Sequence, residues 1–255
     1  MFWLLWLTGC APKVLPADVA ERFRVRLSAD FSVGELVGLP EDAALLLGGV
    51  GVEMDLVVEK TLARTFRDAS QGHRLQFLSA SATMTRGDAA AEAIELTLAG
   101  RSVELRTFPD GELLDVDLIE HVVGPGRLLD VFDVVFPAIT PAPPERLSGQ
   151  RAVHWPVRLS RQQQLLSSAW VSWVMLERDR VTAHVQYDGP WESRGRAGAL
   201  RMSGEGTVRG DVWLGRRDRR LERHTLSWER TLTVTSEAGV KLDQVQRFSG
   251  EVERL

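Results

Sequence analysis

Apolar and polar side chains alternate without interruption near the start of the chain. Phe23, Val25, Leu27, Ala29 and Phe31 alternate with Arg24, Arg26, Ser28 and Asp30, so that every second position is apolar. A period of two places the apolar set on one face of an extended strand. The pattern therefore predicts a strand here with one buried face.

Runs rich in β-branched and aromatic residues predict further strands, and turn residues separate them. The expected strands cover residues 51–66, 74–85, 93–98, 102–108, 112–120, 153–159, 169–177, 181–187, 200–209, 211–214, 219–235 and 240–252. The run over 169–177 is apolar on both faces. The stretch from Gly189 to Gly198 is rich in glycine and is typical of a turn region. Consecutive hairpins of this kind make an antiparallel meander.

A helical spacing appears between Gly124 and Pro137, where Leu128, Phe132 and Phe136 recur at intervals of four residues. Pro125 lies where a first helical turn tolerates proline. This is the main helix that the sequence predicts. A shorter one, of one or two turns, is expected over residues 38–49.

A long antiparallel sheet cannot stay flat, because strand twist accumulates until the sheet curls, splits or closes. A helix on the concave face would bury both surfaces. We therefore expect a mainly β (α+β) fold, with a large curved antiparallel sheet or half-barrel of hairpin meanders and one main helix. Residues 21–255 are expected to form a single domain; the alternative is two halves, 21–139 and 146–255, around a proline-rich linker.

The first ten residues, MFWLLWLTGC, combine a short apolar run with two small residues before a cysteine. This stretch resembles the lipobox of bacterial lipoproteins. The resemblance implies that residues 1–9 are a signal peptide that is removed, that Cys10 carries the lipid, and that residues 10–20 form a lipidated tether. The alternative is a buried N-terminal strand in which Cys10 is a small core residue.

Further consequences follow from the lipobox. Two or three acyl chains on one residue anchor a protein stably in a membrane, whereas one chain does not. Ala11, which is not aspartate, implies sorting to the outer membrane, on its periplasmic side or its surface. No Lys or Arg precedes the apolar run, and a translation start upstream of Met1 would supply the usual basic segment.

Composition excludes several classes of protein. With 44% hydrophobic residues, 26% charged residues and a net charge of −4, the chain has a globular composition, and we expect no nucleic-acid partner. Cys10 is the only cysteine, so neither an intramolecular disulfide nor a cysteine-based zinc site is expected. Apart from the opening, apolar runs fall short of the ~20 residues that span a bilayer as a helix.

No catalytic residues, metal site or cofactor are predicted. The histidines His73, His121, His154, His184 and His224 fall in separate segments without paired-ligand spacing. The pairs Asp115/Asp117 and Glu251/Glu253 have the i,i+2 spacing that a carboxylate dyad on a strand would need, but outward-facing acids produce the same pattern.

Two groups of residues are candidates for binding. An apolar ligand cavity between helix and sheet would be lined by Leu128, Phe132, Phe136, Trp155 and Trp173. A basic patch formed by Arg216, Arg217, Arg219 and Arg220 would contact anionic headgroups or an acidic partner. For the patch, the alternative is a hairpin turn whose charges Asp218 and Glu222 partly neutralise.

The helix-plus-meander pattern, together with the lipobox, is similar to the half-barrel of lipoprotein carriers of the LolA/LolB type, and also to two-halved β-rich envelope lipoproteins. The resemblance implies a lipid-anchored, non-enzymatic envelope protein that binds a hydrophobic ligand or an envelope protein partner. A carrier would keep an apolar cavity between helix and sheet, whereas a scaffold would fill it with Phe132, Phe136 and their neighbours. The alternative is a periplasm-facing hydrolase without a recognisable motif.

Overall fold

A computed structural model of the chain describes residues 20–38, 49–109, 111–116, 127–144, 146–158 and 163–255. Within these residues the elements are β1 (Glu21–Val37), β2 (Val50–Thr65), β3 (Gln71–Arg86), β4 (Glu92–Ile94), β5 (Ser102–Thr107), β6 (Leu113–Val116), α3 (Arg127–Ile139), β7 (Gly149–Arg158), β8 (Gln163–Arg178), β9 (Thr182–Ala197), β10 (Leu200–Gly215), β11 (Leu221–Thr235) and β12 (Lys241–Arg254).

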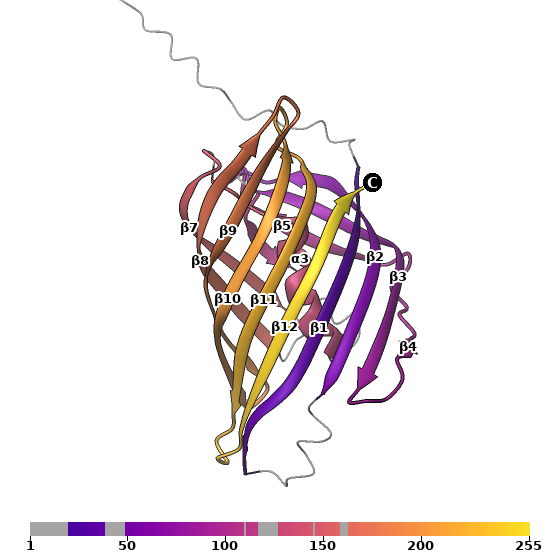
Figure 1. Cartoon of the computed structure of the whole chain (residues 1–255), viewed down its shortest axis with the longest axis vertical. Helices are drawn as coiled ribbons and strands as arrows, with labels where there is room; N and C mark the ends of the chain where they lie inside the picture. The colour runs from indigo at the N-terminus through magenta and orange to yellow at the C-terminus, as the bar shows by residue number, and fades with distance from the viewer. Residues whose placement is uncertain (1–19, 39–48, 110, 117–126, 145, 159–162) are drawn as a thin grey trace, which may run out of the picture.

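All the described strands belong to one sheet that curls into a nearly closed barrel (Figure 1). Its order is β2-β1-β12-β11-β10-β9-β8-β7-β6-β5-β3-β4, and β2 also pairs with β3, which brings the two ends of the sheet together. β1 lies between β2 and β12, so strands from the beginning and the end of the chain are neighbours. The predicted halves, 21–139 and 146–255, thus share one continuous sheet.

The barrel wall has the shortest strand pairing of its described part between β6 and β7. These strands run parallel and are paired only at Val116 and Val157, whereas the other strand pairs are antiparallel. Glu112 bridges this part of the wall: its carboxylate accepts a hydrogen bond from Arg151 at 2.7 Å and another from the backbone N–H of His154 at 3.0 Å. Because Glu112 is 9% exposed, these charge-assisted bonds hold β7 where the ladder is short.

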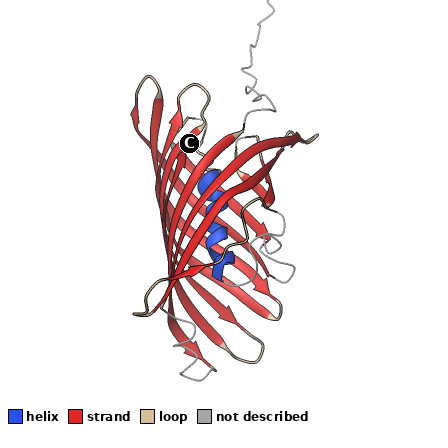
Figure 2. Cartoon of the chain, turned by 90° about the vertical axis from the view of Figure 1, so that its right-hand side faces the viewer, coloured by secondary structure: helices blue, strands red, loops and turns tan. Residues whose placement is uncertain are grey.

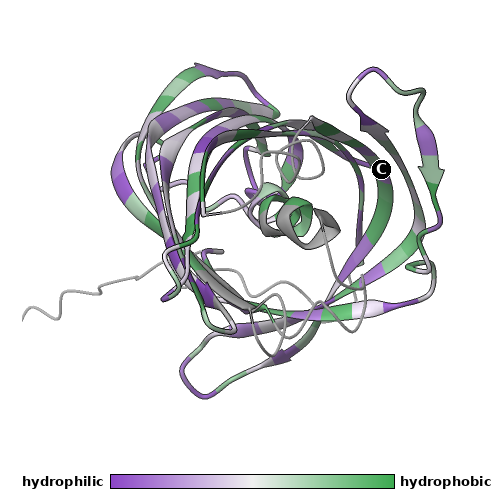
Figure 3. Ribbon diagram, turned by 90° about the horizontal axis from the view of Figure 1, so that it is seen from below, coloured by the Kyte–Doolittle hydropathy of each residue, from purple (hydrophilic) through white to green (hydrophobic). Residues whose placement is uncertain are grey.

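The alternation predicted for β1 is confirmed, since its apolar side chains from Phe23 to Phe31 are buried and the residues between them face outward. The same inward set recurs along β2, β11 and β12. Figures 2 and 3 show α3 inside the ring of strands. Every helical side chain described from Val131 to Ile139 is buried, so the helix is part of the core and not a cover over it.

Two features of the expected fold are wrong. The protein is nearly all β and not α+β, because its one described helix has 13 residues against twelve strands of up to 17. The sheet also curls further than a half-barrel, because β2 pairs with β3. The mainly β, antiparallel and strongly curved character of the fold is confirmed.

The turn predicted from Gly189 to Gly198 is wrong as well, because β9 continues to Ala197. Gly189 faces the β8 backbone so closely that an added Cβ would lie 2.2 Å from the carbonyl oxygen of Trp170. The glycine thus permits a close approach of two strands, which a sequence cannot distinguish from a turn signal. The segments 200–209 and 211–214 form one strand, β10. Residues 39–48 of the predicted short helix lie outside the described residues.

Candidate functional site

The residues proposed to line an apolar cavity are part of the packed interior where the structure describes them. Phe132 and Phe136 are 0% exposed, and their ring centroids lie 6.0 Å apart. Phe132 also makes an edge contact with Phe77 of β3, at 5.7 Å and 78°. Trp173 of β8 points inward against Tyr187, at 4.8 Å. The side chains of Leu128 and Trp155 lie outside the described residues.

A polar contact ties the end of α3 to the barrel wall. His224 of β11 is buried, and its Nδ1 lies 2.7 Å from the carbonyl oxygen of Ala138, while its Nε2 lies 2.9 Å from the hydroxyl of Tyr187. A carbonyl only accepts, so Nδ1 donates and Nε2 accepts from the tyrosine, which is the neutral tautomer. Burial lowers the pKa of His224 to about 4 and raises the pKa of Tyr187.

A second polar cluster lies on the inner wall, where Arg230 of β11 points into the barrel and is 2% exposed. Its guanidinium lies 4.8 Å from the ring centroid of Trp191 and 5.2 Å from that of Phe248. Its Nε donates to Gln246, which in turn donates to Gln244 at 2.6 Å. The aromatic rings and amides thus compensate part of the cost of burying the cation.

His73, His184 and His224 lie in different parts of the described barrel. His184 contacts Asp211 at 2.8 Å and stacks on Trp213 on the outer wall, His73 contacts Thr107 at 3.2 Å, and His224 is inside the barrel. No cluster of three His, Cys, Asp or Glu side chains suited to a metal occurs among the described residues.

Ion pairs cover the outer wall at β1, β2 and β12. Arg24 donates twice to Asp55, at 3.0 and 2.5 Å, and Arg26 pairs with Glu253 at 3.0 Å. Glu251 pairs with Arg223 at 2.6 Å. The Glu251/Glu253 pair thus faces outward among arginines, while Asp117 of the other candidate dyad lies outside the described residues.

The outer wall at β8 has a different chemistry. Leu166, Trp170, Val174 and Leu176 face outward and are 54%, 54%, 51% and 51% exposed. Their inward neighbours, such as Val171 and Trp173, are buried. β8 therefore has an apolar stripe on the solvent side, and we refer to these four residues as the β8 stripe.

The four arginines of the predicted basic patch separate into two groups. Arg216 and Arg219 line a cavity of about 330 Å³ at one end of the barrel, and Arg217 is exposed beside it. Arg220 lies 3.6 Å from Glu21 and 3.5 Å from Asp218, so it belongs to an ion-pair cluster.

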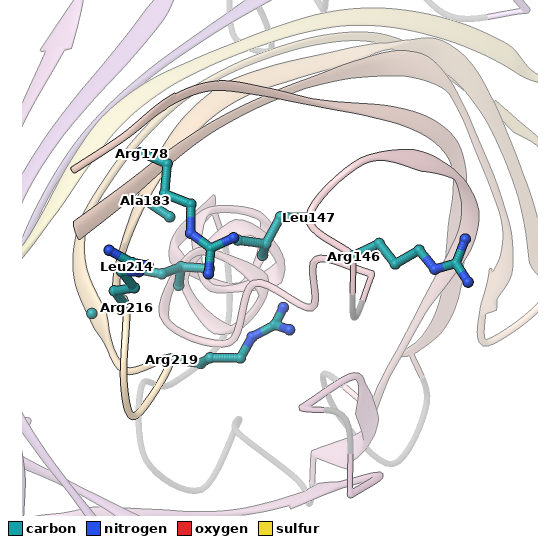
Figure 4. Close-up of a pocket in the computed structure, with 8 residues that line it drawn as sticks. Arg146, Leu147, Arg178, Ala183, Leu214, Arg216 and Arg219 are labelled. Carbon is teal, nitrogen blue, oxygen red and sulfur yellow. The ribbon is translucent and has the colours of Figure 1, made fainter. Parts of the chain in front are cut away.

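The same cavity, which we call the mouth pocket, includes residues that the sequence did not indicate. It is lined by Arg146, Leu147, Arg178, Ala183, Leu214, Gly215, Arg216 and Arg219, seven of which are labelled in Figure 4. Arg178 ends β8 and Arg146 follows the proline-rich linker. Arg178 lies near Arg216 because β9 pairs with both β8 and β10. No sequence motif connects these segments.

Cys10 lies outside the described residues. Among the described residues, no helix has the length and apolar character needed to cross a membrane. A scan against protein-family models gives no match to this chain, and no curated protein matches it.

Proposed function

We propose that this protein is a lipid-anchored, non-enzymatic protein of the cell envelope that binds another envelope protein through the outer wall of its barrel. The anchor rests on the LTGC sequence, with Cys10 as the lipidated residue and the outer membrane as the location. The barrel would then stand at the membrane on the tether of residues 10–20.

The β8 stripe is the observation that carries the binding part of this proposal. The four residues are exposed along one strand, with Ser168 and Ser172 between them. Exposed aromatic and aliphatic residues that share one face are typical of protein–protein contact surfaces, in which tryptophan often contributes most. By contrast, Phe132 and Phe136 occupy space that an apolar cargo would need between helix and sheet. This favours docking on the outside over carriage on the inside.

The carboxylates on either side of Trp170 favour a protein over a bilayer surface as the partner, while Arg194 of β9 lies opposite Leu166. On β9, Glu192 pairs with Ser168 and Asp188 pairs with Ser172, so that exposed carboxylates lie on both sides of Trp170. Carboxylates are costly to desolvate and are repelled by anionic lipids. A protein surface can offer them basic partners.

Site-specific photo-cross-linking in cells tests this function. A photo-reactive phenylalanine analogue in place of Trp170 is expected to give a discrete adduct with one envelope protein, identified by mass spectrometry. The same analogue in place of Arg24, on the ion-paired wall, is the matched control and is expected to give none. A clickable fatty acid supplied to the same cells is expected to label the protein, and Cys10→Ala is expected to abolish the label.

Three outcomes would contradict the proposal. Equal adducts from positions 170 and 24 would show that the β8 stripe has no special role. Adducts with lipid alone at position 170 would mean that the stripe lies against the membrane. Absence of fatty-acid label in the protein with Cys10 intact would remove the anchor.

A further inference from the structure

The mouth pocket combines positive charge with a cavity of the size that small ligands use. Its volume of about 330 Å³ lies at the lower end of the ~300–1,000 Å³ range of ligand pockets. Four arginines contribute to its lining, and none of the eight lining residues is acidic. In Figure 4, Arg178 and Arg219 extend into the same space from β8 and from the β10–β11 turn, whereas Arg146 extends away from them.

The surrounding contacts hold the arginines in place through carbonyl oxygens. Arg216 Nη1 donates to the carbonyl of Asp179 at 3.0 Å, and Arg219 Nη2 donates to the carbonyl of Pro144 at 3.1 Å. The backbone N–H of Arg216 donates to Val181 at 2.7 Å, which joins the β8–β9 turn to the β10–β11 turn. A guanidinium has five N–H donors, so a single bond to a carbonyl leaves Arg216 further donors for an anion.

Two described carboxylates near the mouth pocket, those of Asp179 and Asp218, accept other hydrogen bonds. Asp179 lies near Arg216, but its Oδ1 accepts the backbone N–H groups of Val181 and Thr182, each at 2.6 Å. Asp218 accepts the backbone N–H of Arg220 at 3.2 Å and lies 3.5 Å from its guanidinium. These carboxylates lie beside the pocket and are not among its eight lining residues, four of which are arginines.

The apolar part of the lining and the backbone geometry restrict the ligand further. Leu147, Ala183 and Leu214 supply apolar surface next to the guanidinium groups. Leu147 and Arg219 have φ values of +59° and +57°, a backbone conformation that residues other than glycine adopt at a cost of about 1 kcal/mol or more. A strained backbone conformation persists only where the surrounding structure enforces it, and such conformations occur frequently at functional sites.

We infer that the mouth pocket binds the phosphate group of a small phosphate ester, with Arg178, Arg216 and Arg219 as the phosphate ligands. Guanidinium forks match the geometry of phosphate oxygens and bind them by charge-assisted pairs. The apolar residues would contact the ester's carbon chain. Both a free phosphate ester and the headgroup of a phospholipid present this chemistry.

Calorimetric titration of the full chain, with Cys10→Ser so that no acyl chain contributes, tests the inference. The probes are inorganic phosphate, sn-glycerol 3-phosphate and vesicles of phosphatidylglycerol. The double variant R178Q/R216Q is expected to bind about tenfold more weakly or not at all. The matched control R194Q/R196Q removes the same charge from exposed positions of β9 and is expected to change affinity less than about threefold.

The outcomes separate the ligand sources and can overturn the inference. Pocket-dependent binding of glycerol 3-phosphate supports a free ester, whereas pocket-dependent binding of vesicles alone supports a headgroup. No binding of any probe, or equal losses in the two double variants, would overturn the inference. If circular dichroism shows that R178Q/R216Q is unfolded, Arg178→Gln alone replaces it, because that change keeps the bonds to Asp179 and Pro144.

Discussion

Phe132→Ala is expected to lower the free energy of unfolding by about 3–5 kcal/mol. Phe132 is 0% exposed and contacts Phe77 of β3 and Phe136 of its own helix, so truncation leaves a cavity between α3 and the wall. A loss of this size would be a large fraction of the stability of a typical domain. Urea unfolding followed by far-ultraviolet circular dichroism measures it.

The matched control for this change is Phe108→Ala. Phe108 is 42% exposed, and its replacement is expected to alter the free energy of unfolding by less than about 0.5 kcal/mol. If Phe132→Ala also cost less than about 1 kcal/mol, the packing of α3 inside the barrel would be contradicted.

Acid is expected to destabilise the fold in a defined pH range because of one buried histidine, His224, and one half-buried histidine, His73. Burial lowers the pKa of His224 to about 4, and burial together with the charge of Lys60 lowers the pKa of His73 to about 4, against 6.5 when unfolded. The unfolded chain therefore binds more protons between these values. The contribution of these histidines to the free energy of unfolding should be complete above pH 6.5 and should decrease as the pH falls to about 4. The total loss should be about 3 kcal/mol per histidine.

Three aspartates change the stability in a lower pH range than the histidines do, so the effect of the histidines on the free energy of unfolding can be measured separately. Hydrogen bonds lower the pKa values of Asp68, Asp179 and Asp243 below 3.8, so the stability that they contribute is lost only in stronger acid. Urea unfolding at several pH values between 7 and 4 gives the slope. His224→Gln should reduce that slope and His154→Gln, at an exposed position, should not; an unchanged slope in His224→Gln would contradict the burial of a neutral imidazole.

The strand pattern could be predicted from the sequence wherever one face of a strand is buried and the other is wet. β1 is an example, because its arginines and apolar residues alternate without a break. The helix could be predicted from Phe132 and Phe136, and so could its place on the concave side of a curled sheet. The near-closure of the barrel around it could not, since it follows from the pairing of β2 with β3. The run over 169–177 was apolar on both faces, and the structure explains this by the exposed β8 stripe.

Features that depend on distant pairings could not be predicted. The mouth pocket joins Arg146, Arg178, Arg216 and Arg219 from three separate segments, and the sequence alone grouped the last two with Arg217 and Arg220. Gly189 gave a turn signal, although it permits close packing against Trp170. In each case, the physical cause is a contact between neighbouring strands of the β8–β9–β10 meander, whose register the sequence pattern did not fix.

Native mass spectrometry of the full chain with Cys10→Ser, purified from cells, tests most directly the claim that binding occurs outside a filled barrel. We predict a mass equal to that of the polypeptide at high salt, with no apolar molecule retained. Any lipid held by its headgroup at the mouth pocket should dissociate under those conditions and in R178Q/R216Q. One lipid or other apolar molecule per chain, retained in both cases and released only on unfolding, would contradict the account and make the barrel a carrier.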